Sequence, residues 1–385
     1  MKKSLLALAV LGAFSGIAAA QSSVTVFGVI DVDARYIKNK TGATSVHSKT
    51  LSTDGLSNSR LGFRGVEDLG GGLKAGFWLE SALSADNGTI DQVRFWGRRS
   101  TVSLLGGFGE VRLGRDFTPS YNGYADYATF GTNGSGGAQL FANYVLAGSL
   151  SPNQAQTATR ADNMVSYFLP SGLGGLFGQF SIAAAEGHTG DATTFENMKY
   201  VGGRLGYAAG PVSASVSYGK TDVAPLIAGG VTDNTFSRVT AGASYDFGVA
   251  KLNAFYIVSK LAVRKATDIE VGATVPVGPG QIRVSYARIK VNDGVAALSA
   301  LAPDANKLAL GYVHNLSKRT ALYATAGHIN NKSRDMAAGA TSQFNVASSG
   351  PLAGPAPGTA VAANPGAPGV GQSSTGYEFG IRHNF

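Results

Sequence analysis

The sequence has 385 residues, of which 53 are glycine and none is cysteine, and only 15% are charged, with a formal net charge of +8. The lack of cysteine excludes disulfides and thiolate metal sites. The charged fraction is well below the roughly 25% that soluble domains usually carry. The basic residues are scattered and form no basic run, which argues against nucleic acid as a partner.

Residues 1–20 have the layout of a secretory signal peptide. A basic start is followed by an apolar stretch over 4–16 and by small residues that end at Ala20. An N-terminal anchor helix is the alternative, but the apolar stretch is short and ends in a cleavage motif. We therefore expect cleavage after Ala20 and a mature, exported chain over 21–385.

Apolar and polar side chains alternate with a period of two through the rest of the chain. In 212–218, for example, valine, alanine and tyrosine alternate with three serines. The same pattern occurs at 24–36, 238–246, 269–275, 281–286, 308–312 and 376–385. Successive strand side chains point to opposite faces, whereas a helix would need apolar residues three and four apart. The pattern predicts an all-β chain, and beyond residue 20 no apolar run approaches the ~18 residues of a transmembrane helix.

Short and long breaks take turns between these segments. Seven short, mostly glycine-rich breaks fall at 70–72, 106–107, 171–175, 209–211, 247–250, 277–280 and 317–319. Eight longer breaks fall at 38–57, 85–93, 117–160, 187–197, 222–233, 262–266, 292–305 and 331–373. Short turns at one end and long loops at the other are typical of an outer-membrane barrel. The sequence therefore predicts a 16-stranded antiparallel transmembrane β-barrel, closed so that no sheet edge meets lipid.

Two of the long breaks have distinct predicted roles. The break at 117–160, which we call loop 3, is rich in Gly, Tyr, Asn and Ser. A loop of this length usually has a function, and we expect it to fold inward and narrow a water-filled pore. The break at 331–373, loop 8, contains an uncharged Gly/Pro/Ala/Ser tract at 350–371. Such a tract cannot bury a core; it is either a linker or, because a final strand follows it, a long outer loop.

Four segments resemble the trimeric general porins of Gram-negative bacteria, in particular the beta-proteobacterial type. They are SSVTVFGVID (22–31), SRLGFRGVEDLGGGLKA (59–75), GGFGEVRLGRDFTP (106–119) and YEFGIRHNF (377–385), in the order of the family's strands. The resemblance implies a passive outer-membrane channel for ions and small hydrophilic solutes. It also implies a homotrimer in contact with lipopolysaccharide, and a terminal Phe385 that the barrel-assembly machinery recognises.

The same resemblance implies a constriction in which arginines on the barrel wall face acids on loop 3. Carried over residue by residue, the wall positions are Arg60, Arg64, Arg98, Arg99 and Arg160. Because Arg98 and Arg99 are adjacent, strand alternation allows only one of them to face the lumen squarely. On loop 3, Asp126 matches one of the family's acids, whereas Thr129 stands where other members often have a second acid.

This balance of charge predicts a mild preference for anions. Guanidinium groups stay ionised at physiological pH, and opposite charges across a narrow lumen set a field that filters ions. A surplus of arginine over acid lowers the barrier for anions. Ordinary charges of the lumen or rim are the alternative interpretation of these arginines.

A second charge set resembles the latch between subunits in related trimers. Arg115, at the end of a predicted strand, would meet the second loop of a neighbouring subunit, which carries Asp86 and Asp91. A solvated loop pair within one chain explains the same residues equally well.

Enzyme chemistry has little support. The five histidines are dispersed without metal-ligand spacing, and the chain contains no HExxH, GxSxG or P-loop motif. We expect no catalytic residue, no metal site and no cofactor. Two other functions stay open. The first is a substrate-specific channel, whose solute path would be lined by the aromatic residues of loop 3: Tyr121, Tyr124, Tyr127, Phe130 and Tyr144. The second is a structural or adhesive surface protein, in which the large loop 8 would be the exposed epitope.

Overall fold

The computed structural model describes residues 23–90, 94–143, 156–185, 199–222, 235–261, 264–293, 304–332 and 371–385. The predicted signal peptide over 1–20 lies outside these ranges, and so does loop 8 from 333 to 370. Among the described residues, no helix is long and apolar enough to cross a membrane.

Strands make up almost all of the described chain. The first half contains β1 (Ser23–Thr41), β2 (Thr44–Thr53), β3 (Arg60–Gly70), β4 (Leu73–Ala82), β5 (Arg99–Gly106), β6 (Gly109–Phe117), β7 (Arg160–Phe168) and β8 (Leu176–Ala183). The second half contains β9 (Tyr200–Ala209), β10 (Val212–Asp222), β11 (Thr235–Asp246), β12 (Lys251–Leu261), β13 (Arg264–Val277), β14 (Gly280–Asp293), β15 (Ala305–Asn315), β16 (Thr320–Asn331) and β17 (Ser373–Asn384). Between β6 and β7 lie the short helices α2 (Pro119–Ala125), α3 (Gln139–Ala142) and η2 (Gln156–Ala158).

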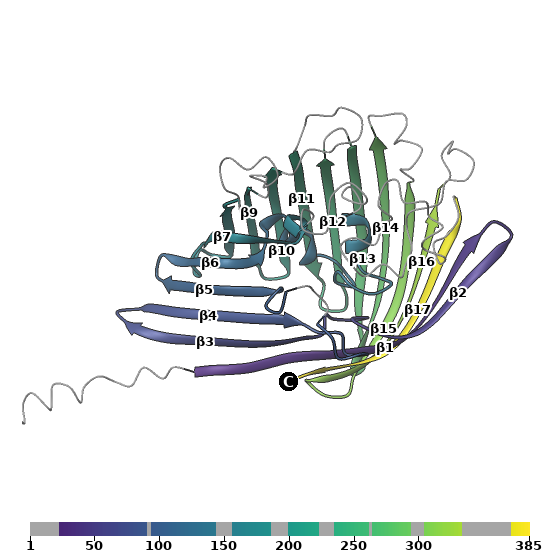
Figure 1. Ribbon diagram of the computed structural model, residues 1–385, viewed down its shortest axis with the longest axis horizontal. Coiled ribbons are helices and arrows are strands. Elements are labelled where there is room, and N and C mark those ends of the chain that lie inside the picture. The colour runs from purple at the N-terminus through teal and green to yellow at the C-terminus, as the bar shows by residue number, and fades with distance from the viewer. Residues whose placement is uncertain are drawn as a thin grey trace, which may run out of the picture.

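These strands close into one antiparallel ring. On one side β1 pairs with β17 along 29–39; on its other side it pairs with β3 along 23–29 and with β2 along 32–41. The strands β2 and β3 therefore share one position, and the ring has sixteen positions. Figure 1 shows the yellow β17 running beside the purple β1. The sixteen-stranded barrel predicted from the sequence is confirmed.

The two faces of the wall differ as the alternation predicts. On β10 and β11, Val216 and Val239 are 59% and 47% exposed on the outer face, while Ser217 and Thr240 are almost fully buried on the inner face. Apolar side chains on the outer face contact hydrocarbon, whereas polar side chains on the inner face point into the barrel and away from lipid.

One break is more ordered than predicted. The segment 38–57 was expected to be an irregular loop, but β1 continues to Thr41, turns at Gly42 with φ +62°, and pairs with β2. Most side chains of β2 are exposed. Because both faces of this hairpin are largely polar, it has no apolar alternation for sequence reasoning to detect.

The depth of the outer face can be tested by placing a charge on it. Val216 lies near the middle of β10, whereas Val249, 78% exposed, lies in the short turn before β12. We expect Val216→Arg to lower the free energy of unfolding from lipid vesicles by about 2–4 kcal/mol, since an arginine at mid-bilayer loses its hydration. Both variants would be measured by urea titration in lipid vesicles, and Val249→Arg should change the free energy of unfolding little. Equal losses for the two variants would contradict the assignment of the outer face to lipid.

Candidate functional site

The described part of loop 3 follows the inner face of the wall from β9 to β17. It begins with α2, which has Pro119 in its first turn, where proline's missing N–H costs nothing, and Thr118 at its N-cap. This helix contacts β9, β10 and β11. Further along, Thr129 meets β13 and Ser135 meets β17 through hydrogen bonds to wall carboxylates. One segment therefore touches wall residues that are up to 243 positions away in sequence.

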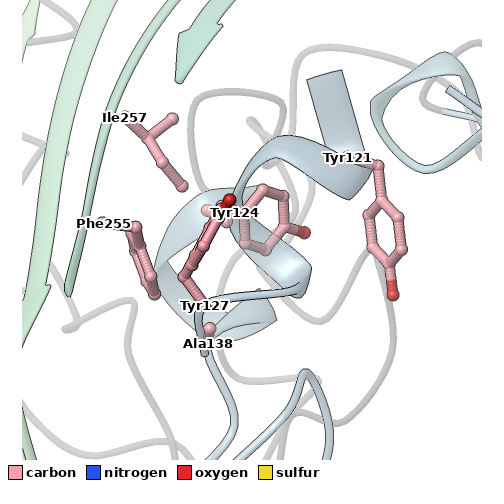
Figure 2. Close-up of a cluster of buried hydrophobic side chains, with 7 residues drawn as sticks. Tyr121, Tyr124, Tyr127, Ala138, Phe255 and Ile257 are labelled. Carbon is pink, nitrogen blue, oxygen red and sulfur yellow. The ribbon is translucent and has the colours of Figure 1, made fainter. Parts of the chain in front are cut away.

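Buried aromatic rings attach α2 to the wall. Figure 2 shows Tyr124 and Tyr127 beside Phe255 and Ile257 of β12. Wall glycines make room for the segment: a Cβ at Gly242 would lie 2.1 Å from the ring of Tyr127. The Tyr124 side chain is fully buried, and this burial raises the pKa of its phenol above the ordinary value. Loop 3 is thus attached to the wall through aromatic side chains that are almost fully buried.

Two buried cations of the wall hold the loop backbone. Arg238 on β11 is 0% exposed and donates hydrogen bonds to the carbonyl oxygens of Ala142 at 2.7 Å and Ala158 at 2.9 Å. Lys307 on β15 is also 0% exposed and donates from its Nζ to the carbonyl oxygens of Gly136, at 2.9 Å, and of Gly137. Neither clamp is apparent from the sequence, because a lone cation in an alternating strand gives no sign of its partner.

Wall acids on the same side also bind the loop. The Glu270 carboxylate accepts a hydrogen bond from the backbone N–H of Thr129 at 3.3 Å and lies 3.5 Å from Lys307 Nζ. The Glu378 carboxylate accepts hydrogen bonds from the N–H and the hydroxyl of Ser135 at 2.9 and 3.0 Å. These charges of β13 and β17 are therefore used to fix loop 3 in place.

The loop acid predicted from the sequence has its own partner. Asp126 follows α2, and its carboxylate lies 2.6 Å from Arg204 Nη1 on β9. The Asp126 side chain is 57% exposed and the Arg204 side chain 8%. Sequence reasoning did not single out Arg204, although its inner-face position in β9 was available as a signal. Asp126 is the one acid among loop 3 residues 118–143.

The opposite part of the wall carries a row of arginines. Arg98 Nε lies 2.5 Å and Arg60 Nε 3.8 Å from the Glu80 carboxylate, so the two cations share one acid. Arg98 is close enough to both Arg60 and Arg160 to repel them electrostatically. The guanidinium of Arg160 stacks 4.2 Å from the ring of Phe117. Three of the five predicted wall arginines are thus brought together.

The row continues onto β14 and β17, where the sequence suggested no selectivity residue. Arg382 on β17 is close enough to repel Arg60 on β3 electrostatically, and it repels Arg283 on β14 in the same way. Among the described residues, the buried Nε of Arg382 has no hydrogen-bond partner. Both arginines have the inner-face parity, which was visible in the sequence, but nothing local linked them to the first group.

Arg64 and Arg99 form a second group nearer the short turns. Their guanidinium groups lie 5.2 and 4.4 Å from the Trp78 ring, and Arg99 Nε is 3.4 Å from the Asp116 carboxylate. The expectation that only one of the neighbours Arg98 and Arg99 faces inward is wrong. Since β5 begins at Arg99, Arg98 precedes the strand and is not bound by its alternation.

The remaining predicted residues are placed as follows. Arg115 Nη1 lies 2.7 Å from the Asp162 carboxylate of its own chain, and its Nε donates to the carbonyl oxygen of Gly97 at 2.6 Å. Asp86 is exposed, and Asp91 lies outside the described residues. Phe385 exchanges two backbone hydrogen bonds with Gly28 of β1 at 3.0 and 3.1 Å. Within the described ranges, no three His, Asp or Glu side chains are placed to hold a metal ion.

Comparison with known proteins identifies this architecture. A family model described as Gram-negative porin matches residues 7–334. The chain belongs to the Gram-negative porin family. It is 40% identical to outer membrane porin protein 32 of Delftia acidovorans, over all of both chains, and 32% identical to an outer membrane porin protein of Bordetella pertussis, over 86% of this chain and 95% of that one. It is also similar to the solved anion-selective porin from Comamonas acidovorans, with a TM-score of 0.72, 37% identity, and coverage of 95% of this chain and 100% of that one.

Membership of this family makes the barrel an outer-membrane porin of the Gram-negative type. Its wall encloses a passive channel. The resemblance found in the four sequence segments is confirmed.

The clamp on loop 3 can be tested through Arg238. In Arg238→Met the carbonyls of Ala142 and Ala158 lose their donor, at a cost of about 1–3 kcal/mol for each buried group left unpaired. We expect amide hydrogen exchange across 118–143 to become faster, while the strands far from the loop keep their protection. Lys220→Met removes the same charge from the rim, where Lys220 lies 3.7 Å from Asp222, and serves as the control. Unchanged exchange across 118–143 in Arg238→Met would contradict a clamping role.

Proposed function

We propose that this porin passes small hydrophilic solutes and ions with a weak preference for anions. One observation carries the proposal. Arg60, Arg98, Arg160, Arg283 and Arg382 form a row, and Glu80 is the one acid in an ion pair with any of them among the described residues. The anion selectivity of the related Comamonas porin supports the same sign of preference.

The pore is narrowed, in this proposal, by loop 3. Its residues 118–143 are held on the inner face of β9–β17 by buried rings and by Arg238 and Lys307. The open part of the lumen then lies between this segment and the arginine row on β3–β7, β14 and β17. Arginine stays ionised at physiological pH, and a surplus of fixed positive charge at a constriction lowers the barrier for anions.

The loop contributes little negative charge to oppose the row. Asp126 is its one acid among 118–143, and it lies 2.6 Å from Arg204. Arg64 and Arg99, stacked near Trp78, would extend the positive field toward the short turns. The proposed selectivity residues are therefore the five arginines of the row, Arg64 and Arg99, with Asp126 as a locally neutralised acid.

A substrate-specific channel is less well supported. That reading needs aromatic side chains of loop 3 to line the solute path. Tyr121, Tyr124, Tyr127 and Phe130 are at most 7% exposed, since they pack against the wall, and Tyr144 lies outside the described residues. We also propose that the protein has no catalytic activity and that its channel function needs no metal or cofactor.

Assembly and export complete the proposal. We infer a homotrimer, as solved relatives of this fold include trimeric forms, and lipopolysaccharide as the surrounding lipid of the outer leaflet. Of the proposed latch, Asp86 is exposed for a neighbouring subunit, whereas Arg115 would have to leave Asp162 of its own chain. Residues 1–20 would act as a cleaved signal peptide, loop 8 (331–373) as an outer loop, and Phe385 as the signal for the barrel-assembly machinery.

The sign of selectivity can be measured as a reversal potential across a KCl gradient in planar bilayers. We expect the native channel to favour chloride. The triple variant Arg60→Gln/Arg98→Gln/Arg382→Gln should lower the anion-to-cation permeability ratio several-fold, because three fixed charges leave the lumen. A matched variant with Lys260, Lys265 and Lys290 changed to Gln loses three charges from the outer face and should keep the native ratio. A native preference for potassium, or equal shifts in both variants, would contradict the proposal.

Solute sorting separates a general porin from a specific channel. Liposome swelling with sugars, amino acids and dicarboxylates should rank neutral solutes by size, since the buried aromatic rings of loop 3 offer no stacking path. Anionic solutes should enter somewhat faster than neutral solutes of equal size. One sugar entering much faster than a smaller one would favour the substrate-specific alternative.

A further inference from the structure

A short segment outside loop 3 also folds into the barrel. Residues 54–59, which we call the inner turn, connect the end of β2 to Arg60 at the start of β3. The Leu56 side chain packs against a buried cluster that contains Val313 of β15 and Tyr323 of β16. Since β17 and β1 separate these strands from β3 in the ring, the inner turn crosses the inner face of the wall.

The carboxylate of Asp31 on β1 fixes the inner turn. Its Oδ2 accepts hydrogen bonds from the backbone N–H groups of Leu56 at 3.0 Å and Ser57 at 2.6 Å. Its Oδ1 accepts one from the Tyr323 hydroxyl at 2.5 Å. Asp31 is fully buried, and a buried charge is stable only where hydrogen-bond donors replace its hydration. Asp31 and the inner turn therefore depend on each other.

This use of Asp31 keeps an acid away from the arginine row. Asp31 lies directly opposite Arg382 in the register of β1 and β17. Its carboxylate is nevertheless directed at the inner turn, and the buried Nε of Arg382 has no hydrogen-bond partner in the part of the chain that the structure describes. A carboxylate turned toward Arg382 would cancel one positive charge of the row.

A second acid shapes the inner turn from within. Asp54 has φ +70°, a left-handed conformation that residues other than glycine rarely adopt. Its carboxylate accepts hydrogen bonds from the Ser59 N–H at 2.5 Å and from Asn58 Nδ2 at 3.0 Å. Such a conformation persists only where the surrounding contacts enforce it. The inner turn is therefore a fixed structure, and it gives the Asn58 side chain one position.

The inner turn also meets the far end of loop 3. A Cβ at Gly134 would lie 2.2 Å from the carbonyl oxygen of Gly55, so the two backbones are in direct contact. The next residue of the loop, Ser135, is held by the Glu378 carboxylate of β17. Loop 3 and the inner turn thus form one continuous layer on the inner face, which ends at Arg60 on β3.

We propose that the inner turn is a second constriction element of the channel, with Asn58 facing the solute path and Asp31 as the positioning residue. Asn58 is half-buried, and its carbonyl oxygen accepts a hydrogen bond from Arg60 Nη1 at 3.3 Å. Because the Arg60 side chain is 30% exposed, a solute that reaches it passes Asn58. The inference rests on the proposed narrowing of the lumen by loop 3, and it adds a specificity-determining residue beside the arginine row.

Cysteine labelling tests the position of Asn58. The native chain has no cysteine, so a single cysteine in the full mature Asn58→Cys protein can be labelled selectively. Channels in planar bilayers would be recorded before and after a sulfonatoethyl or a trimethylammonioethyl thiosulfonate reagent. We expect either adduct to lower the single-channel conductance by about twofold or more, because it adds bulk at a constriction. The sulfonate should also lower the anion-to-cation permeability ratio, and the ammonium should raise it.

Ser48→Cys is the matched control, because Ser48 is an exposed residue of β2 in the hairpin that precedes the inner turn. Mass spectrometry would count the adducts, and labelled Ser48→Cys should keep the native conductance. Three outcomes would each overturn the proposal: no labelling of Asn58→Cys, an adduct there that leaves the conductance unchanged, or equal effects at the two positions.

The role of Asp31 is tested by two variants that lose the same charge. Asp31→Asn keeps one oxygen that can accept from the N–H groups of Leu56 and Ser57, whereas Asp31→Ala leaves both groups without an acceptor. We expect Asp31→Asn to exclude neutral polyethylene glycols at the native size. Asp31→Ala should admit larger ones and show faster amide hydrogen exchange over 54–59. Equal behaviour of the two variants would contradict a positioning role, and the labelling of Asn58→Cys does not depend on either variant folding.

The two proposals can fail separately. A native channel that prefers cations would reject the proposed selectivity, while a block by adducts at Asn58 would still support the second constriction element. A native preference for anions without any block at Asn58 would reject the constriction element alone.

Discussion

The structure depends on the need to pair every backbone polar group that faces lipid. Hydrocarbon offers no hydrogen bonds, so a sheet in a bilayer must close on itself. Here β17 returns to β1 over eleven residue pairs, and the terminal Phe385 adds two hydrogen bonds to Gly28. Once the ring is closed, the side-chain alternation sends apolar residues toward lipid, and buried charges such as Arg238 on β11 and Lys307 on β15 point inward.

Those inward charges divide into two groups with different uses. One group, on β9–β17, binds the backbone of loop 3 and fixes its position; it consists of Arg238, Lys307, Glu270 and Glu378. On β3–β7, together with Arg283 and Arg382, arginines outnumber their acids and remain beside the lumen. In the proposed function, the first group holds loop 3 at the constriction and the second sets the sign of the ion preference. In that proposal, selectivity results from the wall arginines that do not bind the loop.

Sequence reasoning reached the fold because alternation and turn chemistry are local signals. It also found Arg60, Arg98 and Arg160, which the structure brings together, by their resemblance to a family. It missed Arg204, Arg283 and Arg382, because their roles depend on neighbours that are far away in the sequence, from 78 positions for Arg204 and Asp126 to 322 for Arg382 and Arg60. It missed β2 because a hairpin with two polar faces has no apolar period, and it misjudged Arg98 because alternation does not apply one residue before a strand.

The most direct test of the charge surplus is to locate ions in the lumen by anomalous diffraction. Crystals of the porin would be soaked separately in rubidium and in bromide salts of equal concentration. The account predicts bromide peaks beside Arg60, Arg98 and Arg382, and no rubidium peak of comparable height along that wall. Rubidium along the row, or a lumen in which neither ion is enriched there, would contradict it.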